Sequence, residues 1–172
     1  MENPARRRSR TLRDFAFNMQ VYEASIQYHL VRLGDEEPLD TPDKLVRYMG
    51  GAFIDCPVQE SFYVVCLNQK CRPLSRTRIT LGTLTATLAH PREIFRVAIL
   101  AAAAKIIVVH QHPSGDPAPS AADHHVTKQL HEAGKIMQIE LVDHVVLGTK
   151  EDDPTGRGYF SFRQAGLLGG AA

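Results

Sequence analysis

The first part of the chain carries apolar residues at helical spacing. Between residues 14 and 33 they recur mostly three or four positions apart, which places them on one face of a helix. These residues are Phe15, Met19, Val21, Tyr22, Ile26, Leu30 and Leu33. Gly34 ends this predicted helix, and a polar loop follows it.

A second helix is predicted to begin next to this loop. Thr41 can cap its first turn, and Pro42 is tolerated at the first helical position. Gly50 and Gly51 end it. The two predicted helices make residues 14–56 a helical extension in front of the rest of the chain.

Short apolar runs replace the helical pattern after this extension. Residues 61–68 are rich in β-branched and aromatic residues and predict a strand, with residues 76–80 as its hairpin partner. Residues 105–110 form a continuous apolar run that ends in a loop, which is typical of a central strand. Residues 139–148 predict another strand, and residues 159–168 a strand followed by a short helix.

Helical segments lie between these runs. Residues 94–105 are nearly all apolar, so we expect a helix there that is buried between other layers. Ser120 begins a further helix, and Ala133 with Gly134 resembles its end. Since strands and helices alternate, the predicted fold class is α/β, with a mixed β-sheet flanked by helices.

Composition and charge fit one soluble globular domain. The 172 residues are 44% hydrophobic and 23% charged, and a net charge of +1 gives the whole chain no electrostatic preference for nucleic acid. Residues 1–13 are an exception, because five arginines crowd there: Arg6, Arg7, Arg8, Arg10 and Arg13. This basic arm is either solvated and disordered or a tail that contacts DNA phosphates.

Cysteine usage and hydropathy bear on the compartment. Cys56, Cys66 and Cys71 form neither an even-numbered framework nor a CxxC pair, so we expect reduced thiols. The chain shows no signal peptide and no apolar run of membrane-spanning length. We therefore expect a cytoplasmic protein without a membrane partner.

Residues 110–123, HQHPSGDPAPSAAD, carry the candidate chemistry. His110 and His112 lie on one side of an extended segment, and Asp123 falls in the first turn of the following helix. Two imidazoles and one carboxylate leave a tetrahedral Zn²⁺ with an open position, as in catalytic sites. Local roles are the alternative, because Ser120 can cap this helix and Asp123 can be its acidic partner.

Three other histidines are weaker candidates. His124 and His125 point about 100° apart on a helix, so at most one approaches the site. His144 either orients a ligand from outside the metal's own ligand set or is a buried histidine with a satisfied hydrogen bond.

The spacing His110-x-His112-x₇-Ser120-x₂-Asp123 resembles the JAMM (MPN+) metallopeptidase motif, which also uses a glutamate on an upstream strand. Glu60 stands just before the strand predicted at 61–68, where that residue is expected. The chain resembles the RadC family more closely still, over about residues 57–168. The matching stretches are ESFYVVCLNQK, GTL at 82–84, HPREIFRVAI, HQHPSGDPAPSAAD, the helix that contains Thr127, LVDHVVLG and YFSFRQAGLL.

The resemblance implies a JAB/MPN-type (cytidine-deaminase-like) domain over residues 57–172 and a zinc-dependent hydrolase that cleaves a peptide or isopeptide bond, with a ubiquitin-like conjugate as one candidate substrate. It implies that His110, His112 and Asp123 hold Zn²⁺. Glu60 would be the general base and then the general acid, and Ser120 would donate to the developing oxyanion.

The sequence departs from the family pattern in two places. Gln111 stands where the family usually has Asn, and residues 1–56 show no glycine-rich hairpin of the helix-hairpin-helix module that many RadC proteins carry. The chain therefore resembles a short member of the kind found on mobile elements.

Two alternatives to the hydrolase are a DNA-repair accessory protein or nuclease and a non-catalytic scaffold. The oligomeric state is left open.

Overall fold

The computed structural model describes residues 37–55, 57–81 and 89–168. The basic arm at residues 1–13, the helix predicted at 14–33, Cys56 and the GTL stretch at 82–84 lie outside the described residues. Within the described part of the chain, no helix is both long and apolar enough to span a membrane.

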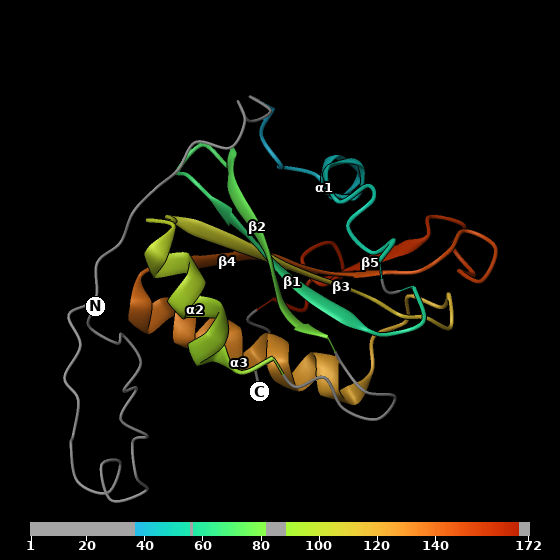
Figure 1. Ribbon diagram of the computed structural model, residues 1–172. Coiled ribbons are helices and arrows are strands. Elements are labelled where there is room, and N and C mark those ends of the chain that lie inside the picture. Colours follow the sequence, from blue (N-terminus) through green and yellow to red (C-terminus); the bar gives the residue numbers. More distant parts are fainter. Residues whose placement is uncertain (1–36, 56, 82–88, 169–172) are drawn as a thin grey trace, which may run out of the picture. The chain divides into compact units, whose positions relative to one another are not determined.

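The described strands form one mixed sheet with the order β2-β1-β3-β4-β5 (Figure 1). β1 (Ser61–Leu67) pairs antiparallel with β2 (Pro73–Leu81) on one side and with β3 (Lys105–Gln111) on the other. β3 runs parallel to β4 (Glu140–Leu147), and β5 (Tyr159–Ser161) pairs antiparallel with β4 at the edge. The predicted mixed α/β architecture is confirmed, with β3 at its centre.

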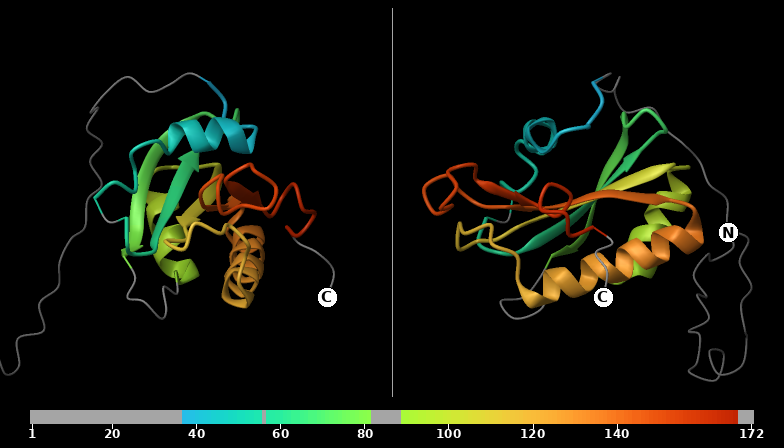
Figure 2. Two further views of the ribbon diagram at one scale, coloured as in Figure 1. Left: turned by 90° about the vertical axis from the view of Figure 1, so that its right-hand side faces the viewer. Right: turned by 180° about the vertical axis from the view of Figure 1, so that it is seen from behind.

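Helices cover both faces of this sheet (Figures 1 and 2). α2 (Pro91–Leu100) and α3 (Ala121–Met137) pack on one face, against alternate residues such as Val64 and Val108. α1 (Pro42–Tyr48) lies on the other face. Thr41 caps α1, as predicted, by accepting a hydrogen bond from the backbone of Lys44 at 3.4 Å. Each face of β3 is therefore buried, and the residues at its end are held between two layers.

The helix predicted at 94–105 is shorter and more exposed than expected. It starts at Pro91 and ends at Leu100, and Ile99 and Leu100 are 50% and 43% exposed, so the expectation of a helix buried between layers is wrong. Although alanines follow, Lys105 already pairs with β1 and β4. Helix propensity alone would extend α2 through the alanines to Lys105, but Lys105 is part of β3 in the structure.

Two further predictions at helix ends are wrong. α3 does not stop at Gly134 but continues to Met137. A Cβ at Gly134 would lie 2.6 Å from the carbonyl oxygen of Ile139, so this glycine allows the chain to return closely toward β4. The short helix predicted after β5 is instead a series of turns over residues 162–166.

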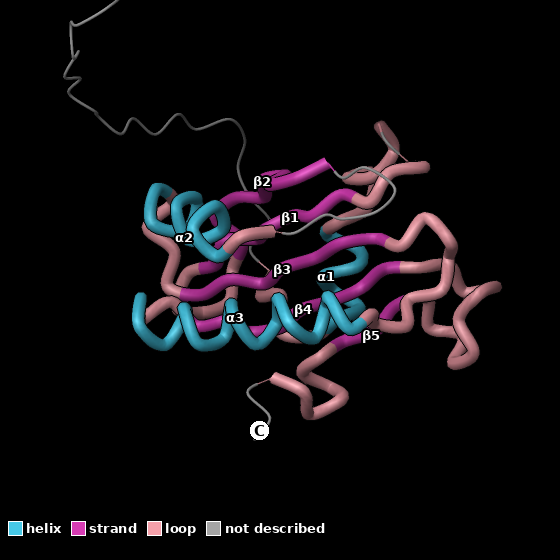
Figure 3. The backbone as a smooth tube through the Cα atoms, turned by 90° about the horizontal axis from the view of Figure 1, so that it is seen from below, coloured by secondary structure: helices cyan, strands magenta, loops and turns pink. Residues whose placement is uncertain are grey.

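Two loops at one end of the sheet are locked together (Figure 3). They follow β3 and β4, and they meet where the backbone N–H of Thr149 donates to the carbonyl of Gly115 at 2.7 Å. A Cβ at Gly148 would lie only 2.1 Å from that same carbonyl oxygen. Gly115 itself has a φ of +87°, which favours glycine. The loop after β3, which leads to α3, is thereby fixed by the loop after β4.

Candidate metal centre

Three side chains from the stretch at residues 110–123 converge at the end of β3. The Nε2 atoms of His110 and His112 lie 3.2 Å apart. Asp123 Oδ1 lies 3.1 Å from His110 Nε2, and Asp123 Oδ2 lies 3.6 Å from His112 Nε2. His110 and Asp123 are buried, whereas His112 is partly exposed. The structure therefore brings together the three residues that the sequence proposes as metal ligands.

The spacing of these atoms fits a metal ion. A tetrahedral zinc site with bonds of about 2.0 Å places its ligand atoms about 3.3 Å apart. The observed separations of 3.1 and 3.2 Å at His110 Nε2 are close to that value. Ser120 occupies the other carboxylate oxygen, because both its backbone N–H (2.7 Å) and its hydroxyl (2.6 Å) donate to Asp123 Oδ2. Asp123 Oδ1 is thus the oxygen that faces His110, while Oδ2 is the oxygen nearer to His112.

A buried chain of hydrogen bonds determines which ring nitrogen of neutral His110 carries the lone pair and which carries the proton. The hydroxyl of Thr127 donates its proton to the carbonyl of Asp123 at 2.5 Å, so it must accept from Nδ1–H of His144 at 2.6 Å. His144 Nε2 is then an acceptor, and it receives Nδ1–H of His110 at 2.9 Å. In a neutral His110 the lone pair is therefore on Nε2, the nitrogen that faces Asp123.

His112 is oriented in the same sense by the loop that follows it. Its Nδ1 lies 2.9 Å from the backbone carbonyl of Asp116, which can only accept, so Nδ1 carries a proton. Two imidazole lone pairs and one carboxylate oxygen consequently point at one another. Such an arrangement of acceptors is stable when a cation lies between them.

His144 is close enough to be considered with this group. Ligand atoms of His110, Asp123 and His144 lie within 4.8 Å of one another, and all three residues are buried, so they form a potential metal-binding group. His144 Nε2 already bonds the Nδ1 side of His110, however, while His112 lies on the Nε2 side. We therefore interpret His144 as the residue that orients His110 rather than as a ligand beside Asp123.

The charges of the cluster favour cation binding. Burial opposes ionisation of Asp123, yet its interactions with His110 and His112 hold the pKa of this carboxyl well below its usual range. The hydrogen bond to Asp123 raises the pKa of His112, against the effect of burial. Burial lowers the pKa of His144 well below its usual range, so this imidazole is neutral. A proton and a metal ion thus compete for His112 Nε2, with Asp123 ionised in either case.

The two residues proposed for catalysis lie next to this cluster. Glu60 stands directly before β1, its side chain is 32% exposed, and its Oε1 lies 4.0 Å from His110 Nε2. Ser120 and Asp123 form a capping box at the start of α3, so the local alternative foreseen for both residues is also present. In this arrangement the Ser120 hydroxyl proton is directed at Asp123, and its role as an oxyanion donor stays a prediction.

Four further residues near the cluster are ones that the sequence leaves open or does not indicate: His124, His125, Thr127 and His144. The sequence leaves His144 open between a ligand-orienting role and ordinary burial. The structure places it against His110, and the ring of Phe162 stacks on it with the ring centroids 4.8 Å apart. Thr127 was not singled out for the site. His124 and His125 are exposed, and His124 contacts Phe162 rather than the ligand cluster.

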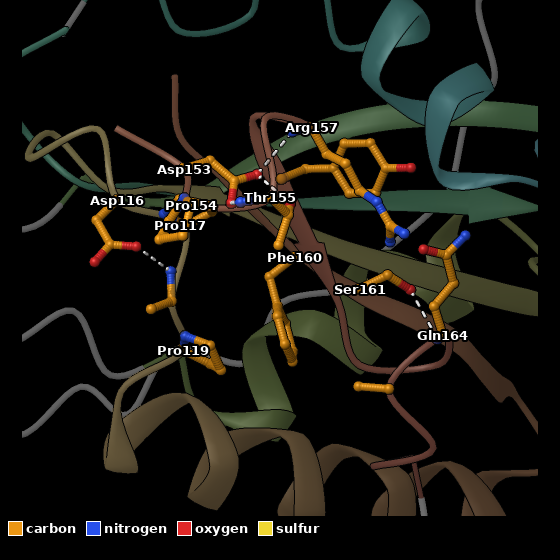
Figure 4. A pocket seen from close by; sticks show the side chains of 13 residues that line it. Asp116, Pro117, Pro119, Asp153, Pro154, Thr155, Arg157, Phe160, Ser161 and Gln164 are labelled. Atoms are coloured by element: carbon orange, nitrogen blue, oxygen red, sulfur yellow. Dashed lines mark hydrogen bonds between the residues drawn. The ribbon is translucent and has the colours of Figure 1, made fainter. Parts of the chain in front are cut away.

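A pocket of about 400 Å³ opens beside the loop that carries the ligands (Figure 4). One wall is Asp116–Pro119, which lies between His112 and Ser120 in the sequence. The other comes from β5, the loop before it and the turns after it. Figure 4 shows Phe160 between the prolines and Gln164. Its volume lies in the range of ligand pockets, and its lining is mostly apolar.

Comparison with known proteins connects this site with a family. The model of the RadC-like JAB domain matches residues 39–167. Among curated proteins, a UPF0758 protein of Chlorobium luteolum is 40% identical over 149 residues, which cover 87% of this chain and 63% of that relative. UPF0758 proteins of Chlorobaculum tepidum and Thermotoga maritima are 48% and 41% identical over 70% and 77% of the chain.

The chain spans between about half and two thirds of the length of these relatives: 63%, 51% and 55%. The match nevertheless covers the described sheet, its three helices and all the residues of the candidate metal centre. The chain therefore belongs to the RadC-like JAB-domain family, as its resemblance in sequence predicted.

Proposed function

We propose that this chain is a zinc-dependent hydrolase that cleaves a peptide or isopeptide bond. The observation that carries the proposal is the convergence of two imidazole lone pairs and Asp123 Oδ1, with the Glu60 carboxylate beside them and not among them. A structural zinc site would close all four positions with protein ligands, whereas three ligands leave one position for a reactant. A catalytic centre needs such an open position.

His110, His112 and Asp123 would hold the ion. Bound zinc would lower the pKa of a water in the open position to about 7, which would make it available as a nucleophile at neutral pH. Glu60 would accept the proton released from water and deliver it to the amine nitrogen as the C–N bond breaks. Its exposure of 32% leaves the carboxylate accessible to a substrate at the surface.

The hydrolase proposal predicts that Glu60→Gln abolishes turnover while zinc stays bound. We expect the rate to fall by about 10²–10⁴-fold, as for loss of a general base, because the substituted amide cannot accept the proton. Zinc content at one ion per chain is measured by elemental analysis. Turnover is measured on ubiquitin-like conjugates, short peptides and DNA. Glu151→Gln, an exposed change outside the cluster, is the matched control.

Three outcomes separate the candidate functions. Peptide or isopeptide cleavage that requires zinc and Glu60 supports the proposal, whereas undiminished cleavage by Glu60→Gln contradicts the role of this residue. DNA affinity that falls steeply with salt and depends on residues 1–13 would favour the DNA-processing alternative. That alternative draws on the RadC family and on an arm that lies outside the described residues.

A further inference from the structure

Gln111 lies between His110 and His112 in the sequence, but its side chain bonds the backbone of the segment that leads into β1. It is the last residue of β3 and is 8% exposed. Because side chains alternate along a strand, it projects to the face opposite His110 and His112. Its amide reaches the neighbouring strand: Oε1 accepts from the backbone N–H of Ser61 at 3.0 Å, and Nε2 donates to the backbone carbonyl of Gln59 at 2.6 Å.

These two hydrogen bonds enclose Glu60. One partner precedes Glu60 and the other follows it, so a single side chain holds the backbone on both sides of the proposed general base. The β1–β3 ladder itself reaches only to the pair Phe62–His110. Glu60 therefore lies just past the last backbone pairing, after the turns at residues 57–59. The Gln111 amide therefore continues the contact between β3 and the β1 segment beyond the pair Phe62–His110, to Ser61 and Gln59.

We propose that Gln111 is a positioning residue for Glu60, a clamp that fixes where its carboxylate lies relative to the metal ligands. The inference rests on the proposed hydrolase function for its catalytic consequence and on geometry for the clamp itself. Gln111 does not touch the reacting atoms. It acts through the backbone of Gln59 and Ser61, and the Glu60 carboxylate lies 4.0 Å from His110 Nε2 as a result.

The clamp needs an amide of this length. One end must accept a proton and the other must donate one, which Leu and Glu cannot do together. Asn has both groups but is shorter by one methylene, about 1.5 Å. To keep both hydrogen bonds, Asn would have to draw residues 59–61 toward β3 and displace Glu60.

The test compares Gln111→Leu, Gln111→Glu and Gln111→Asn with Gln129→Leu, an exposed change on α3. Zinc content and thermal unfolding show whether each variant is folded and loaded. Amide hydrogen exchange of Ser61, followed by NMR, reports the clamp directly. The change in the ¹³C shift of the Glu60 carboxyl when zinc is added reports its position, and kcat and KM report the chemistry.

For Gln111→Leu we expect zinc to stay at one ion per chain, Ser61 exchange to rise at least about tenfold, and the zinc-dependent Glu60 shift to shrink. On a substrate of the wild-type chain, kcat should fall about tenfold or more with KM within about twofold, because a displaced base alters the reaction step. Gln111→Glu should keep the amide of Ser61 protected from exchange and still reduce the zinc-dependent Glu60 shift. Gln111→Asn should give exchange rates and shifts between those of the wild type and those of Gln111→Leu.

Unchanged Ser61 exchange and an unchanged Glu60 shift in Gln111→Leu would overturn the clamp. Wild-type kcat in that variant, despite faster exchange, would overturn its catalytic role. If Gln111→Leu does not fold, the Glu and Asn variants decide through the same two NMR measurements. Absence of turnover by the wild-type chain would contradict the hydrolase proposal alone, since the NMR measurements need no substrate.

Discussion

Thr127→Val tests whether the buried chain of hydrogen bonds prepares His110 for metal. The substitution is nearly isosteric and replaces one group, the hydroxyl that accepts from His144 at 2.6 Å and donates to the carbonyl of Asp123 at 2.5 Å, with a methyl group. Thr127 is 1% exposed and His144 is fully buried, so no solvent replaces that partner. The proton on His144 Nδ1 is left without an acceptor inside the protein.

The cost divides into two measurable parts. A buried donor without a partner destabilises the fold by about 1–3 kcal/mol. His144 can avoid this cost by carrying its proton on Nε2, but that proton then faces His110 Nδ1–H across 2.9 Å. His110 would have to shift its own proton to Nε2 and lose the lone pair that faces Asp123. Zinc affinity should therefore fall about 10–100-fold, as for other residues that orient metal ligands.

The assay is competition for zinc with a chromophoric chelator, together with urea unfolding of the metal-free protein. Thr127→Ser keeps the hydroxyl and is the matched control, with an affinity expected within about threefold of wild type. If Thr127→Val loses stability but binds zinc within about twofold of wild type, the chain of hydrogen bonds does not govern His110, and our assignment of its free nitrogen is wrong.

Two further predictions concern His112 and the loop contact. Because Asp123 raises the pKa of His112, a proton displaces zinc below that pKa; apparent affinity should fall about tenfold per pH unit as the pH falls, and a flat chelator-competition profile would count against His112 as a ligand. Gly148→Ala places a Cβ 2.1 Å from the Gly115 carbonyl and should lower the free energy of unfolding by about 1–3 kcal/mol. Gly156→Ala, with φ +68° and open space around it, is the comparison in urea unfolding: it carries backbone strain without a clash, whereas Gly148 lies outside the left-handed region, so the loss at Gly148 reports the clash.

Local patterns predicted much of the fold and most of the cluster. His110 and His112 point the same way because they are two residues apart in a strand, and Asp123 follows a helix start that Ser120 marks. Such features depend on a few neighbouring residues, so the sequence displays them. The strand β3 was likewise visible as a continuous apolar run.

The contacts that could not be predicted from the sequence depend on the register between segments that are distant in the chain. Thr127 meets His144 only because α3 packs across β4, and Gln111 meets Ser61 across 50 positions of sequence. The end of α2 is a similar case: alanines continue past Leu100, but Ala102 has a φ of +49° and Ala104 already bonds the backbone of Leu67 and Glu140. Pairing of this kind is a property of the assembled sheet.

Asp123 joins the start of a helix to the metal cluster within a single carboxylate. Oδ2 accepts twice from Ser120, while Oδ1 faces His110. A carboxylate can do both because it has two equivalent oxygens, but the amide of Asn has only one. Asp123→Asn would therefore keep only one of these two roles, the acceptor for Ser120 or the ligand atom that faces His110. The Ser120 hydroxyl would still cap α3, because it accepts from the backbone N–H of residue 123 at 3.2 Å, so the variant should lose metal or half of the capping box while the helix start persists.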